Sequence, residues 1–325
     1  MKVLITSDLH IQSGIYTDIG IDYIDYLSEY CNEYGITDLI IAGDIFEKSS
    51  KINNDAFIPL FFKFMELKES GLNITIVLGN HDIYSVDNDS LVETFAVFGK
   101  VIKNFEQIKI GGRTIDFLPY TKDVDLVPSS GDILITHLSI ADFSFDNKFH
   151  VSEKAGMPRK IFEGYNKVFT GHFHRPQTKG NIIYMGSPYQ MNFGEIGQRK
   201  GFVVYDLEYD DWERVWYEQA PIYKKITVNN FQNEDVTNCF VQVEIKEKMD
   251  NYVQLKHILY EKGALIVSPK FLDSEEEITV NEETKLDMNS SVPVMVKEYI
   301  LNSIEATGID NKELVTIFDK VLASI

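Results

Sequence analysis

The chain has 325 residues, of which 44% are apolar and 25% are charged. This composition is typical of a folded globular protein and excludes a disordered chain, and the length suggests about two domains. The formal net charge of -19 excludes a protein that coats nucleic acid through its overall charge.

Three further features narrow the class of protein. Between positions 154 and 200 the chain has eight basic residues and only two acidic ones, so a polyanionic substrate is expected to bind there. Cys31 and Cys239 are too few for a disulfide framework or a thiolate metal site. We find neither a signal-peptide core nor an apolar run of the roughly 20 residues that a membrane span needs. The sequence therefore predicts a soluble protein of the cytoplasm.

Five apolar segments have the character of buried strands, and each is followed by side chains of the kinds that bind metals. The segments are residues 3–5, 39–41, 76–78, 133–135 and 168–169. The side chains that follow them are, in the same order, Asp8 and His10, Asp44, Asn80 with His81 and Asp82, His137, and His172 with His174. Because open α/β sheets bind ligands at the carboxyl ends of their strands, we expect these side chains to meet at one metal centre.

Predicted helices alternate with the first strands. Residues 21–34 carry apolar side chains at helical spacing, and Gly35 follows as a cap. Residues 55–70 are apolar on almost every side, which predicts a helix buried on two sides, either within the chain or at a subunit interface. We expect residues 57–67 to form a dimer contact, and residues 91–98 can form a third helix. The alternation predicts a parallel sheet with right-handed crossovers.

The second half of the chain adds further strands. Gly111 and Gly112 predict a hairpin turn. Other strands are expected at residues 182–185, 201–207, 214–217, 239–245 and 264–267, and a helix at residues 251–261. We expect the second β layer to be largely antiparallel. The predicted fold class is α/β, with a two-layer β core flanked by helices, a small α/β cap and a C-terminal helical pair.

These patterns divide the chain into four segments. Residues 1–218 form the expected main domain, and residues 219–271 form the small capping domain. Residues 272–291 are rich in acids and read as a solvated linker. Residues 292–325 predict two amphipathic helices broken at Gly308. A helix pair this short is marginal alone, so it either docks back onto the main domain or binds a partner.

The set of predicted ligands indicates which metals fit. It contains Asp, His and Asn but no Cys, and such mixed ligation suits Mn2+, Fe2+ or Zn2+ better than Ca2+. A single Asp-x-His or His-x-His motif is more often a surface accident than a ligand pair. The joint occurrence of all the motifs in this order, each behind an apolar strand, favours the metal site.

The order of these motifs resembles that of the calcineurin-like metallophosphoesterases, which is Asp-x-His, Gly-Asp, Gly-Asn-His-Asp or Glu, His, and Gly-His-x-His. The resemblance covers residues 8–174. It implies that one metal ion is held by Asp8, His10, Asp44 and His174, and the other by Asp44, Asn80, His137 and His172, with Asp44 bridging. Two such ions make water a nucleophile and stabilise an in-line displacement at phosphorus. The resemblance also implies that His81 contacts the phosphate and gives a proton to the leaving oxygen.

A second segment narrows the resemblance. Residues 186–201 contain Gly-Ser-Pro, Phe-Gly-Glu and Lys-Gly, and they are similar to the SbcD nucleases, the bacterial and phage relatives of the eukaryotic meiotic recombination eleven protein. The length is nearest to that of the short phage members. One position departs from the family: some relatives carry a His, thought to assist the proton donor, where this chain has Glu47. A His dyad is therefore in doubt.

The resemblance to SbcD implies a function and partners. It implies a Mn2+-dependent DNA nuclease of repair or recombination, acting as a 3′-to-5′ exonuclease on duplex ends and an endonuclease on single strands. It also implies a homodimer, and an SbcC-type ABC ATPase bound by residues 292–325. The sequence has no Gly-x-x-x-x-Gly-Lys-Ser/Thr motif, so any ATP dependence must come from that partner.

Several side chains are candidates for contact with DNA. The basic candidates are Arg175, Lys179, Arg199 and Lys200, and Arg175 is preferred because it directly follows His174. The aromatic side chains near the motifs are Phe143, Phe145, Phe149, Tyr189 and Phe193. Core packing is the favoured interpretation for these aromatics, and stacking on a frayed DNA end is the alternative.

Two other classes of function stay open. The first is a small-molecule or phosphoprotein phosphoesterase. Protein phosphatases of this superfamily usually show Gly-Asp-x-x-Asp-Arg-Gly, whereas residues 43–49 are Gly-Asp-Ile-Phe-Glu-Lys-Ser, which disfavours that branch. The second is a non-catalytic scaffold, which is disfavoured because every predicted ligand and His81 are present.

Overall fold

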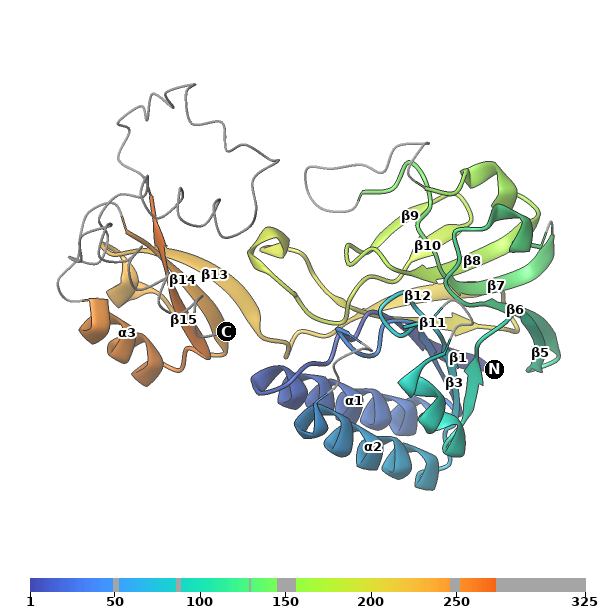
Figure 1. The fold of residues 1–325 in the computed structure, drawn as a ribbon, viewed down its shortest axis with the longest axis horizontal. Coiled ribbons are helices and arrows are strands. Elements are labelled where there is room, and N and C mark those ends of the chain that lie inside the picture. The colour runs from blue at the N-terminus through green and yellow to red at the C-terminus, as the bar shows by residue number, and fades with distance from the viewer. Residues whose placement is uncertain (49–52, 86–88, 129, 145–155, 246–251, 273–325) are drawn as a thin grey trace, which may run out of the picture. The chain divides into compact units, whose positions relative to one another are not determined.

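The computed structural model describes residues 1–48, 53–85, 89–128, 130–144, 156–245 and 252–272 (Figure 1). The predicted acidic linker beyond Leu272 and the predicted helical pair at residues 292–325 lie outside the described residues. The described residues all belong to one compact unit, Met1–Leu272.

The first sheet has six strands in the order β12-β11-β1-β2-β3-β4. Its strands are β1 (Lys2–Thr6), β2 (Asp38–Ala42), β3 (Asn73–Val77), β4 (Lys100–Ile102), β11 (Gly201–Asp206) and β12 (Asp211–Trp216). Strands β1 to β4 are parallel to one another, whereas β11 is antiparallel to both β1 and β12. This confirms the predicted parallel sheet at the start of the chain.

Two long helices and a short 3-10 helix, Leu91–Val97, connect the parallel strands. Helix α1 (Ile15–Tyr34) ends as predicted at Gly35, which has a left-handed conformation with φ 65. The helix begins six residues before the predicted start. The prediction missed these residues because glycine has a low helix propensity and Gly20 interrupts the apolar pattern. A Cβ atom at Gly20 would lie 2.7 Å from Cγ1 of Ile11, so close packing against Ile11 requires a glycine at this position.

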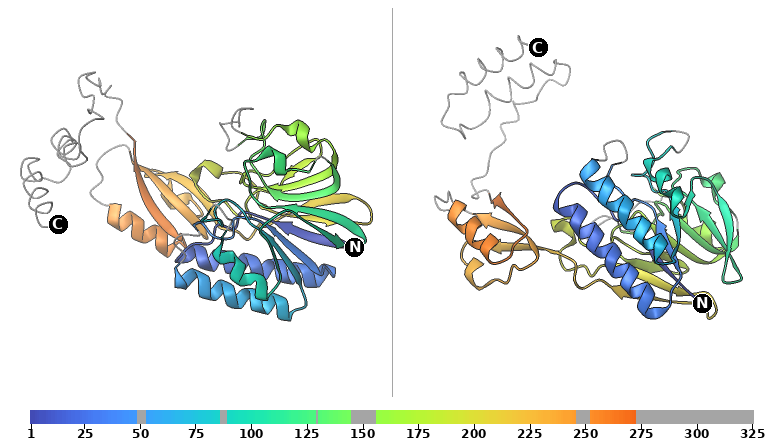
Figure 2. Two further views of the ribbon diagram at one scale, coloured as in Figure 1. Left: turned by 45° about the vertical axis from the view of Figure 1, so that its right-hand side comes forward. Right: turned by 90° about the horizontal axis from the view of Figure 1, so that it is seen from below.

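Helix α2 (Asn54–Glu69) has one buried face, which includes Leu60, Phe64 and Leu67. The prediction that this helix is buried on two sides is wrong for the chain alone, because Ile58 is 48% exposed and Phe62 is 53% exposed. The two helices lie side by side (Figures 1 and 2).

The second sheet has the order β5-β6-β7-β8-β10-β9. Its strands are β5 (Glu106–Ile110), β6 (Arg113–Leu118), β7 (Gly131–His137), β8 (Tyr165–Gly171), β9 (Gln177–Lys179) and β10 (Ile182–Tyr184). The predicted hairpin at Gly111 and Gly112 joins β5 to β6, and both glycines have positive φ.

The prediction that the second layer is largely antiparallel is wrong for this sheet. Strands β6, β7, β8 and β10 are all parallel, and only the outer pairs β5–β6 and β9–β10 are antiparallel. Parallel strands are normally covered on both faces and are therefore apolar throughout. That pattern is present in Ile133, Leu134 and Ile135 of β7, which are fully buried.

An apolar core lies between the two sheets and holds them together. Its members include Val3, Ile5, Ile40 and Val77 from the first sheet and Ile115, Ile133, Ile135 and Phe169 from the second. A second core lies between the first sheet and helices α1 and α2, and a third covers part of the second sheet. The predicted two-layer β core flanked by helices is therefore confirmed.

A smaller three-stranded sheet follows the two large ones. It contains β13 (Ile222–Thr227), β14 (Cys239–Ile245) and β15 (Ile266–Phe271), all parallel, together with helix α3 (Tyr252–Glu261). Phe240 stacks on Tyr16 of α1, with ring centroids 5.5 Å apart, and on Tyr223, at 4.7 Å. Aromatic packing therefore joins this sheet to α1.

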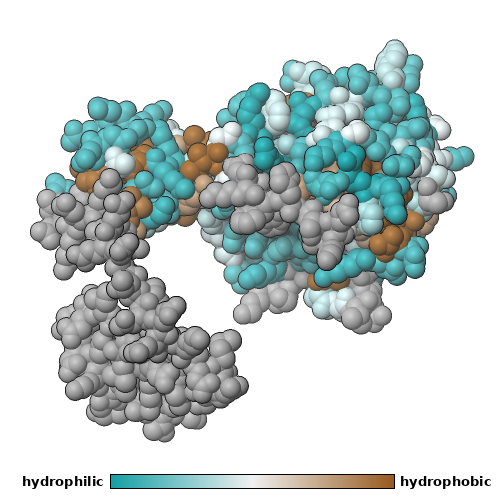
Figure 3. Space-filling view, turned by 90° about the horizontal axis from the view of Figure 1, so that it is seen from above, coloured by the Kyte–Doolittle hydropathy of each residue, from teal (hydrophilic) through white to brown (hydrophobic). Residues whose placement is uncertain are grey.

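The described residues show a mainly hydrophilic face and two unpaired cysteines. Within the described ranges, no helix combines the length and the apolarity needed to cross a membrane. The face seen in Figure 3 is mainly hydrophilic, with smaller hydrophobic areas. Cys31 and Cys239 are buried free thiols.

We expect the Phe64→Ala variant to lower the free energy of unfolding by about 3–5 kcal/mol, because it leaves a cavity in the core. Phe64 is fully buried, and its ring lies 4.6 Å from that of Phe95. Urea unfolding followed by circular dichroism measures the change. The control is Tyr209→Ala, since Tyr209 is 76% exposed and its loss should change stability by no more than about 0.5 kcal/mol. Equal effects of the two substitutions would contradict the assignment of this core.

Candidate metal centre

The predicted ligands lie where the strands of both large sheets end. Asp8 and His10 follow β1, Asp44 follows β2, and Asn80 follows β3 in the first sheet. His137 is the last residue of β7, and His172 and His174 follow β8 in the second sheet. The structure brings all seven side chains together in groups whose donor atoms lie close to one another.

The backbone is unusual at these positions. Asp8, His10, Asp44 and His172 have positive φ angles of 56, 46, 55 and 92. Residues other than glycine rarely adopt such backbone angles, and these angles persist only where the surrounding structure holds them. Here the amide of Asp8 donates to the carbonyl of Gly43 at 3.0 Å, and the amide of His10 donates to that of Asp44 at 3.0 Å. The loops after β1 and β2 therefore hold each other in shape.

Two glycines give the ligands the space they need. A Cβ atom on Gly43 would lie 2.3 Å from Nδ1 of His137, and one on Gly79 would lie 2.2 Å from Oδ1 of Asp44. Either contact would displace a predicted ligand. The glycines of the Gly-Asp and Gly-Asn-His-Asp motifs are thus required by the close approach of backbone to side chain.

The first group of donors comprises Asp8, His10, Asp44 and His174. Nε2 of His10 lies 3.1 Å from Nε2 of His174 and 3.5 Å from Oδ2 of Asp44. Asp8 is held in place by the hydroxyl of Ser7, which donates to its Oδ2 at 2.6 Å. Lone pairs of two imidazoles and two carboxylates therefore face a common space.

The second group comprises Asp44, Asn80, His137 and His172. Nε2 of His137 lies 3.1 Å from Oδ2 of Asp44 and 3.2 Å from Oδ1 of Asn80, and Nδ1 of His172 lies 2.7 Å from the same amide oxygen. Nδ1 of His137 donates to the carbonyl of Ala42 at 2.8 Å, which leaves Nε2 free to act as a ligand. Oδ2 of Asp44 is close to histidines of both groups, as a bridging carboxylate would be.

The charge states of these groups suit cations. Burial by itself would raise the pKa of Asp44, but His137, His10 and His81 lower it below the usual range, so the carboxylate is charged at neutral pH. Burial, with a contribution from His137, lowers the pKa of His172 to about 4, so this imidazole is neutral. Burial by itself would lower the pKa of His137, but Asp44 and Asp8 raise it to about 9, so without a cation this imidazole holds a proton that a bound ion would displace. Carboxylates, imidazoles that have lost this proton and an amide oxygen are together the donor set of divalent ions such as Mn2+, Fe2+ and Zn2+. The residues fit a pair of such ions.

His81 lies beside the predicted ligands and is held by the backbone. With His10 and Asp44 it forms a further group whose donor atoms lie within 4.8 Å of one another. Its amide donates to Oδ1 of Asp44 at 2.8 Å. Its ring Nδ1 lies 2.5 Å from the carbonyl oxygen of Glu47, to which it can only donate. The free ring nitrogen is therefore Nε2, and the ring lies 4.8 Å from that of His10.

Glu47 contacts two histidines of the centre in different ways. Its carboxylate lies 2.9 Å from Nδ1 of His10, and this contact lowers the pKa of Glu47. The contact of Glu47 with His81 is made by its main chain. A side chain at this position is therefore not needed to orient His81.

Asp82 is a structural member of the centre whose role the sequence did not reveal. It is fully buried, and its carboxylate accepts hydrogen bonds from the amides of Asp44 at 2.8 Å, Ile45 at 3.0 Å and Gly79 at 2.9 Å. It ties the loop after β2 to the loop after β3. Its place in the Gly-Asn-His-Asp motif was the only signal in the sequence.

One of the four expected DNA contacts is wrong. Lys200 is 4% exposed, and its ammonium donates to the carbonyl of His174, the hydroxyl of Ser187 and the carboxylate of Glu195. An ammonium group that spends its three donors inside the protein cannot bind a phosphate from solution.

The other basic candidates are nearer to solvent. Arg175 is half-buried. Lys179 is partly buried, donates to the carbonyl of Asp142 and lies over the ring of Phe143. Arg199 is 59% exposed, pairs with Glu218 and stacks on Trp216.

The aromatic residues considered for stacking on DNA differ in their burial. Phe143 and Tyr189 are buried, as core packing predicts. Phe193 is half-buried and packs edge-on against Tyr223 of β13, with ring centroids 4.9 Å apart. Phe145 and Phe149 lie outside the described residues.

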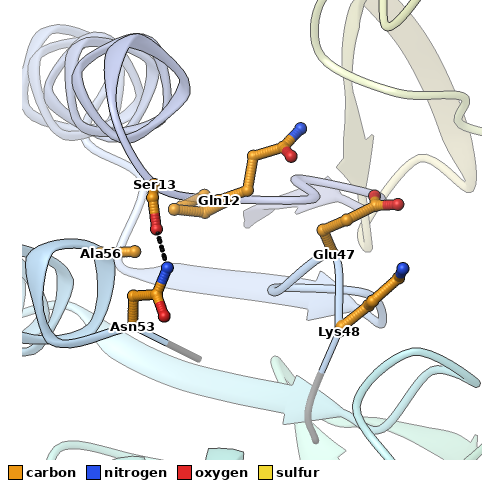
Figure 4. A pocket seen from close by; sticks show the side chains of 7 residues that line it. Gln12, Ser13, Glu47, Lys48, Asn53 and Ala56 are labelled. Carbon is orange, nitrogen blue, oxygen red and sulfur yellow. Dashed lines mark hydrogen bonds between the residues drawn. The ribbon is translucent and has the colours of Figure 1, made fainter. Parts of the chain in front are cut away.

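Two pockets adjoin the centre. One, of about 320 Å³, is lined by residues that include Ser13, Glu47, Lys48 and Asn53 (Figure 4). In it, the amide of Asn53 donates to the hydroxyl of Ser13. The other, of about 450 Å³, includes His172 in its lining. The second pocket thus gives the donor group of His172 open space for a substrate, whereas the lining of the first contains none of the predicted ligands.

Comparisons with known proteins agree with this geometry. Residues 1–204 match the family model described as calcineurin-like phosphoesterase. Exonuclease subunit 1 of Enterobacteria phage T4 is 24% identical over 340 residues, which cover 97% of this chain and 96% of that protein. The DNA double-strand break repair protein Mre11 of Methanopyrus kandleri is 19% identical over 380 residues, covering 100% of this chain and 83% of that protein. The SbcD component of the SbcCD nuclease of Escherichia coli K12 is 22% identical over 255 residues, covering 62% of this chain and 63% of that protein.

Proposed function

The chain belongs to the calcineurin-like phosphoesterase family, and from this premise we propose that it is the Mn2+-dependent nuclease subunit of a DNA repair or recombination complex. The proposed activities are 3′-to-5′ exonuclease on duplex ends and endonuclease on single strands. The observation that carries the proposal is the convergence of seven ligand side chains, with His81 beside them, at the ends of strands from both sheets. The similarity to a phage exonuclease subunit and to a DNA double-strand break repair protein, each over almost the whole chain, supports DNA as the substrate.

The proposed mechanism assigns one role to each part of the site. When bound, two divalent ions lower the pKa of water and stabilise charge on the attacking and leaving oxygens. Asp44 lies between both donor groups and fixes their separation. Nδ1 of His81 donates its proton to the carbonyl of Glu47, so Nε2 is the nitrogen without a partner in the protein. In the imidazolium form, Nε2–H would give its proton to the leaving oxygen and the ring would become neutral.

The basic side chains nearest to solvent are proposed to position the DNA backbone. Arg175 directly follows the predicted ligand His174 and is half-buried, and a guanidinium forms strong paired bonds with phosphate. Arg199 and Lys179 are weaker candidates, because both already have partners within the protein.

Hydrolysis of an end-labelled linear duplex by the purified chain tests the proposal. We expect shortening from the 3′ ends in Mn2+ and little or none in Mg2+ alone. A small phosphodiester, bis(4-nitrophenyl) phosphate, is assayed in parallel. Turnover of the small ester without DNA cleavage, also in the presence of the ATPase partner, would favour the small-molecule phosphoesterase alternative and contradict the nuclease.

The proposed complex contains an SbcC-type ABC ATPase. The proposal divides the chain into a nuclease domain at residues 1–218, a cap at residues 219–271, an acidic linker at residues 272–291 and an ATPase-binding segment at residues 292–325. The names of two relatives describe them as subunits of larger nucleases. The sequence has no phosphate-binding loop of its own, so ATP hydrolysis needs a second protein.

Deletion of residues 293–325 is expected to abolish association with the ATPase and to leave hydrolysis of bis(4-nitrophenyl) phosphate within about twofold of the intact chain. The reason is that the predicted ligands all lie between residues 8 and 174, and a short amphipathic helix pair gains its stability from a partner. Co-purification with the ATPase measures association. Retained association would contradict the role of this segment.

We also propose a homodimer formed through the exposed face of α2. Ile58 and Phe62 expose large apolar side chains on this helix, and such residues in the middle of an interface are often binding hot spots. Phe62→Asp is expected to weaken dimerisation at least about tenfold, as measured by sedimentation. The control is Tyr209→Asp, which changes an aromatic residue that is even more exposed than Phe62 and lies in the turn between β11 and β12. A dimer that tolerates Phe62→Asp would contradict this surface.

A further inference from the structure

A buried ion pair lies directly behind the predicted ligand His174. Glu195 is 6% exposed and Lys200 is 4% exposed, and Oε2 of Glu195 lies 2.8 Å from Nζ of Lys200. Neither residue belongs to the two donor groups or to the proposed mechanism. Burying two charges is costly, and replacing such a pair by apolar residues often stabilises a protein. Stability alone therefore does not account for this pair.

The contacts of the pair converge on His174. The ammonium of Lys200 donates to the main-chain carbonyl of His174 at 2.6 Å and to the hydroxyl of Ser187 at 3.0 Å. On the other side, Oε1 of Glu195 lies 3.2 Å from Nδ1 of His174. One residue of the pair thus holds the backbone of His174, and the other holds its ring.

The loop that carries Glu195 is built to keep its carboxylate in place. The amide of Met191 donates to Oε2 of Glu195 at 3.0 Å. The side chain of Asn192 begins a short 3-10 helix, Phe193–Glu195, by accepting from the amide of Gly194 at 2.8 Å. The carboxylate therefore has fixed partners besides His174 and needs no rearrangement to accept from its ring.

The direction of this hydrogen bond decides which nitrogen of His174 is a ligand. Because a carboxylate can only accept, Nδ1 carries the proton and Nε2 keeps its lone pair. Nε2 is the atom that lies 3.1 Å from Nε2 of His10. Glu195 thus aims the lone pair of His174 into the first donor group.

In the second donor group, the ring of His137 has no carboxylate partner at Nδ1 like the one that Glu195 provides to His174. The Nδ1 atom of His137 donates to the neutral carbonyl of Ala42. A carboxylate partner makes an imidazole a stronger donor to a metal than a neutral partner does, and loss of such a partner typically lowers metal affinity about 10–100-fold. The two groups are therefore chemically unequal.

We propose that Glu195 is a positioning residue for His174, held by Lys200, and that it raises the affinity of the first donor group for a divalent ion. The inference rests on the two-ion centre within the proposed function and is independent of DNA as the substrate. It predicts two classes of bound ion, of which only one responds to the loss of Glu195.

The test is Mn2+ binding to the whole chain, followed by electron paramagnetic resonance and calorimetry, for the Glu195→Gln variant. We expect the Kd of one of the two Mn2+ ions to rise about 10–100-fold, while that of the other changes less than about twofold. The control is Glu218→Gln, because Glu218 is an exposed carboxylate on a neighbouring segment and its loss should leave both Kd values unchanged. Equal weakening of both ions, or no change in either, would overturn the proposal.

A second variant separates positioning from folding. Glu195→Gln alone leaves the ammonium of Lys200 buried without its carboxylate, and this destabilises the loop. The double variant Glu195→Gln with Lys200→Met removes both charges, and its thermal unfolding is measured first. We expect it to show the same selective loss of affinity for one ion. A return of both Kd values to those of the unmodified chain would overturn the role of Glu195.

These measurements also keep the two hypotheses apart. If the unmodified chain binds two Mn2+ ions with unequal response to Glu195→Gln but does not cleave DNA, the nuclease proposal fails and the positioning role stands. If it cleaves DNA and Glu195→Gln leaves both affinities unchanged, the positioning role alone fails.

Discussion

The Asp44→Asn variant is expected to hydrolyse bis(4-nitrophenyl) phosphate more slowly by a factor on the order of 10³ or more, which corresponds to several kcal/mol of lost transition-state stabilisation. Oδ2 of Asp44 lies 3.5 Å from Nε2 of His10 and 3.1 Å from Nε2 of His137. Asparagine keeps the shape and one oxygen but loses the charge that two cations would share. We therefore also expect the variant to bind fewer than two Mn2+ ions at concentrations that saturate the unmodified chain.

A buried aspartate elsewhere in the fold provides the control. Asp116 of β6 is 2% exposed, and its carboxylate accepts from the hydroxyl of Tyr165 at 2.7 Å. The Asp116→Asn variant should lower the unfolding temperature while leaving the rate per folded molecule and the Mn2+ content unchanged. If Asp44→Asn retained both ions and a rate within tenfold of the unmodified chain, the bridging role would be wrong.

The second large effect is expected at His81. Its replacement by serine should slow DNA cleavage by about 10²–10⁴-fold, the usual contribution of a general acid. The effect on bis(4-nitrophenyl) phosphate should be much smaller, because nitrophenolate leaves readily without a proton. Mn2+ content and DNA binding should be retained, since His81 belongs to neither proposed ligand set.

The contrast between the two substrates makes this prediction specific. The control is His257→Ser, because the side chain of His257 is 74% exposed on α3 and should affect neither substrate. An equal loss of activity on both substrates, or a loss of Mn2+, would show that His81 acts as a ligand or as a structural residue instead of a proton donor.

The sequence predicted the centre well because its signals are local. Each ligand follows its strand by a few residues, and parallel strands bring their carboxyl ends to one edge. Nine side chains of metal-binding types could therefore be identified from spacing and residue type, and the family resemblance selected seven of them as ligands. The structure brings these seven together. The start of α1 and the direction of the strands in the second sheet were harder, since both depend on distant contacts such as that of Gly20 with Ile11.

The supporting residues could not be predicted for the same reason. Asp82 acts on the backbone of Asp44 and Ile45, far away in sequence. Lys200 looked like a surface cation because it is one of several basic residues in its segment, yet its partners include the carbonyl of His174. Whether a charged side chain is buried depends on partners that only the folded chain supplies.

The left-handed backbone at four of the predicted ligands has a consequence for how such proteins change over time. Each residue other than glycine in that conformation costs about 1–3 kcal/mol, and a whole protein is stable by only about 5–15 kcal/mol. Replacing Asp8, His10, Asp44 or His172 by glycine would relieve that backbone strain while destroying the site. Each of these substitutions would therefore exchange metal binding for lower backbone strain, and at Asp8 and Asp44 it would also remove an acceptor of the amides of His172 and His81. The site thus shows the conflict between stability and activity that functional sites commonly have.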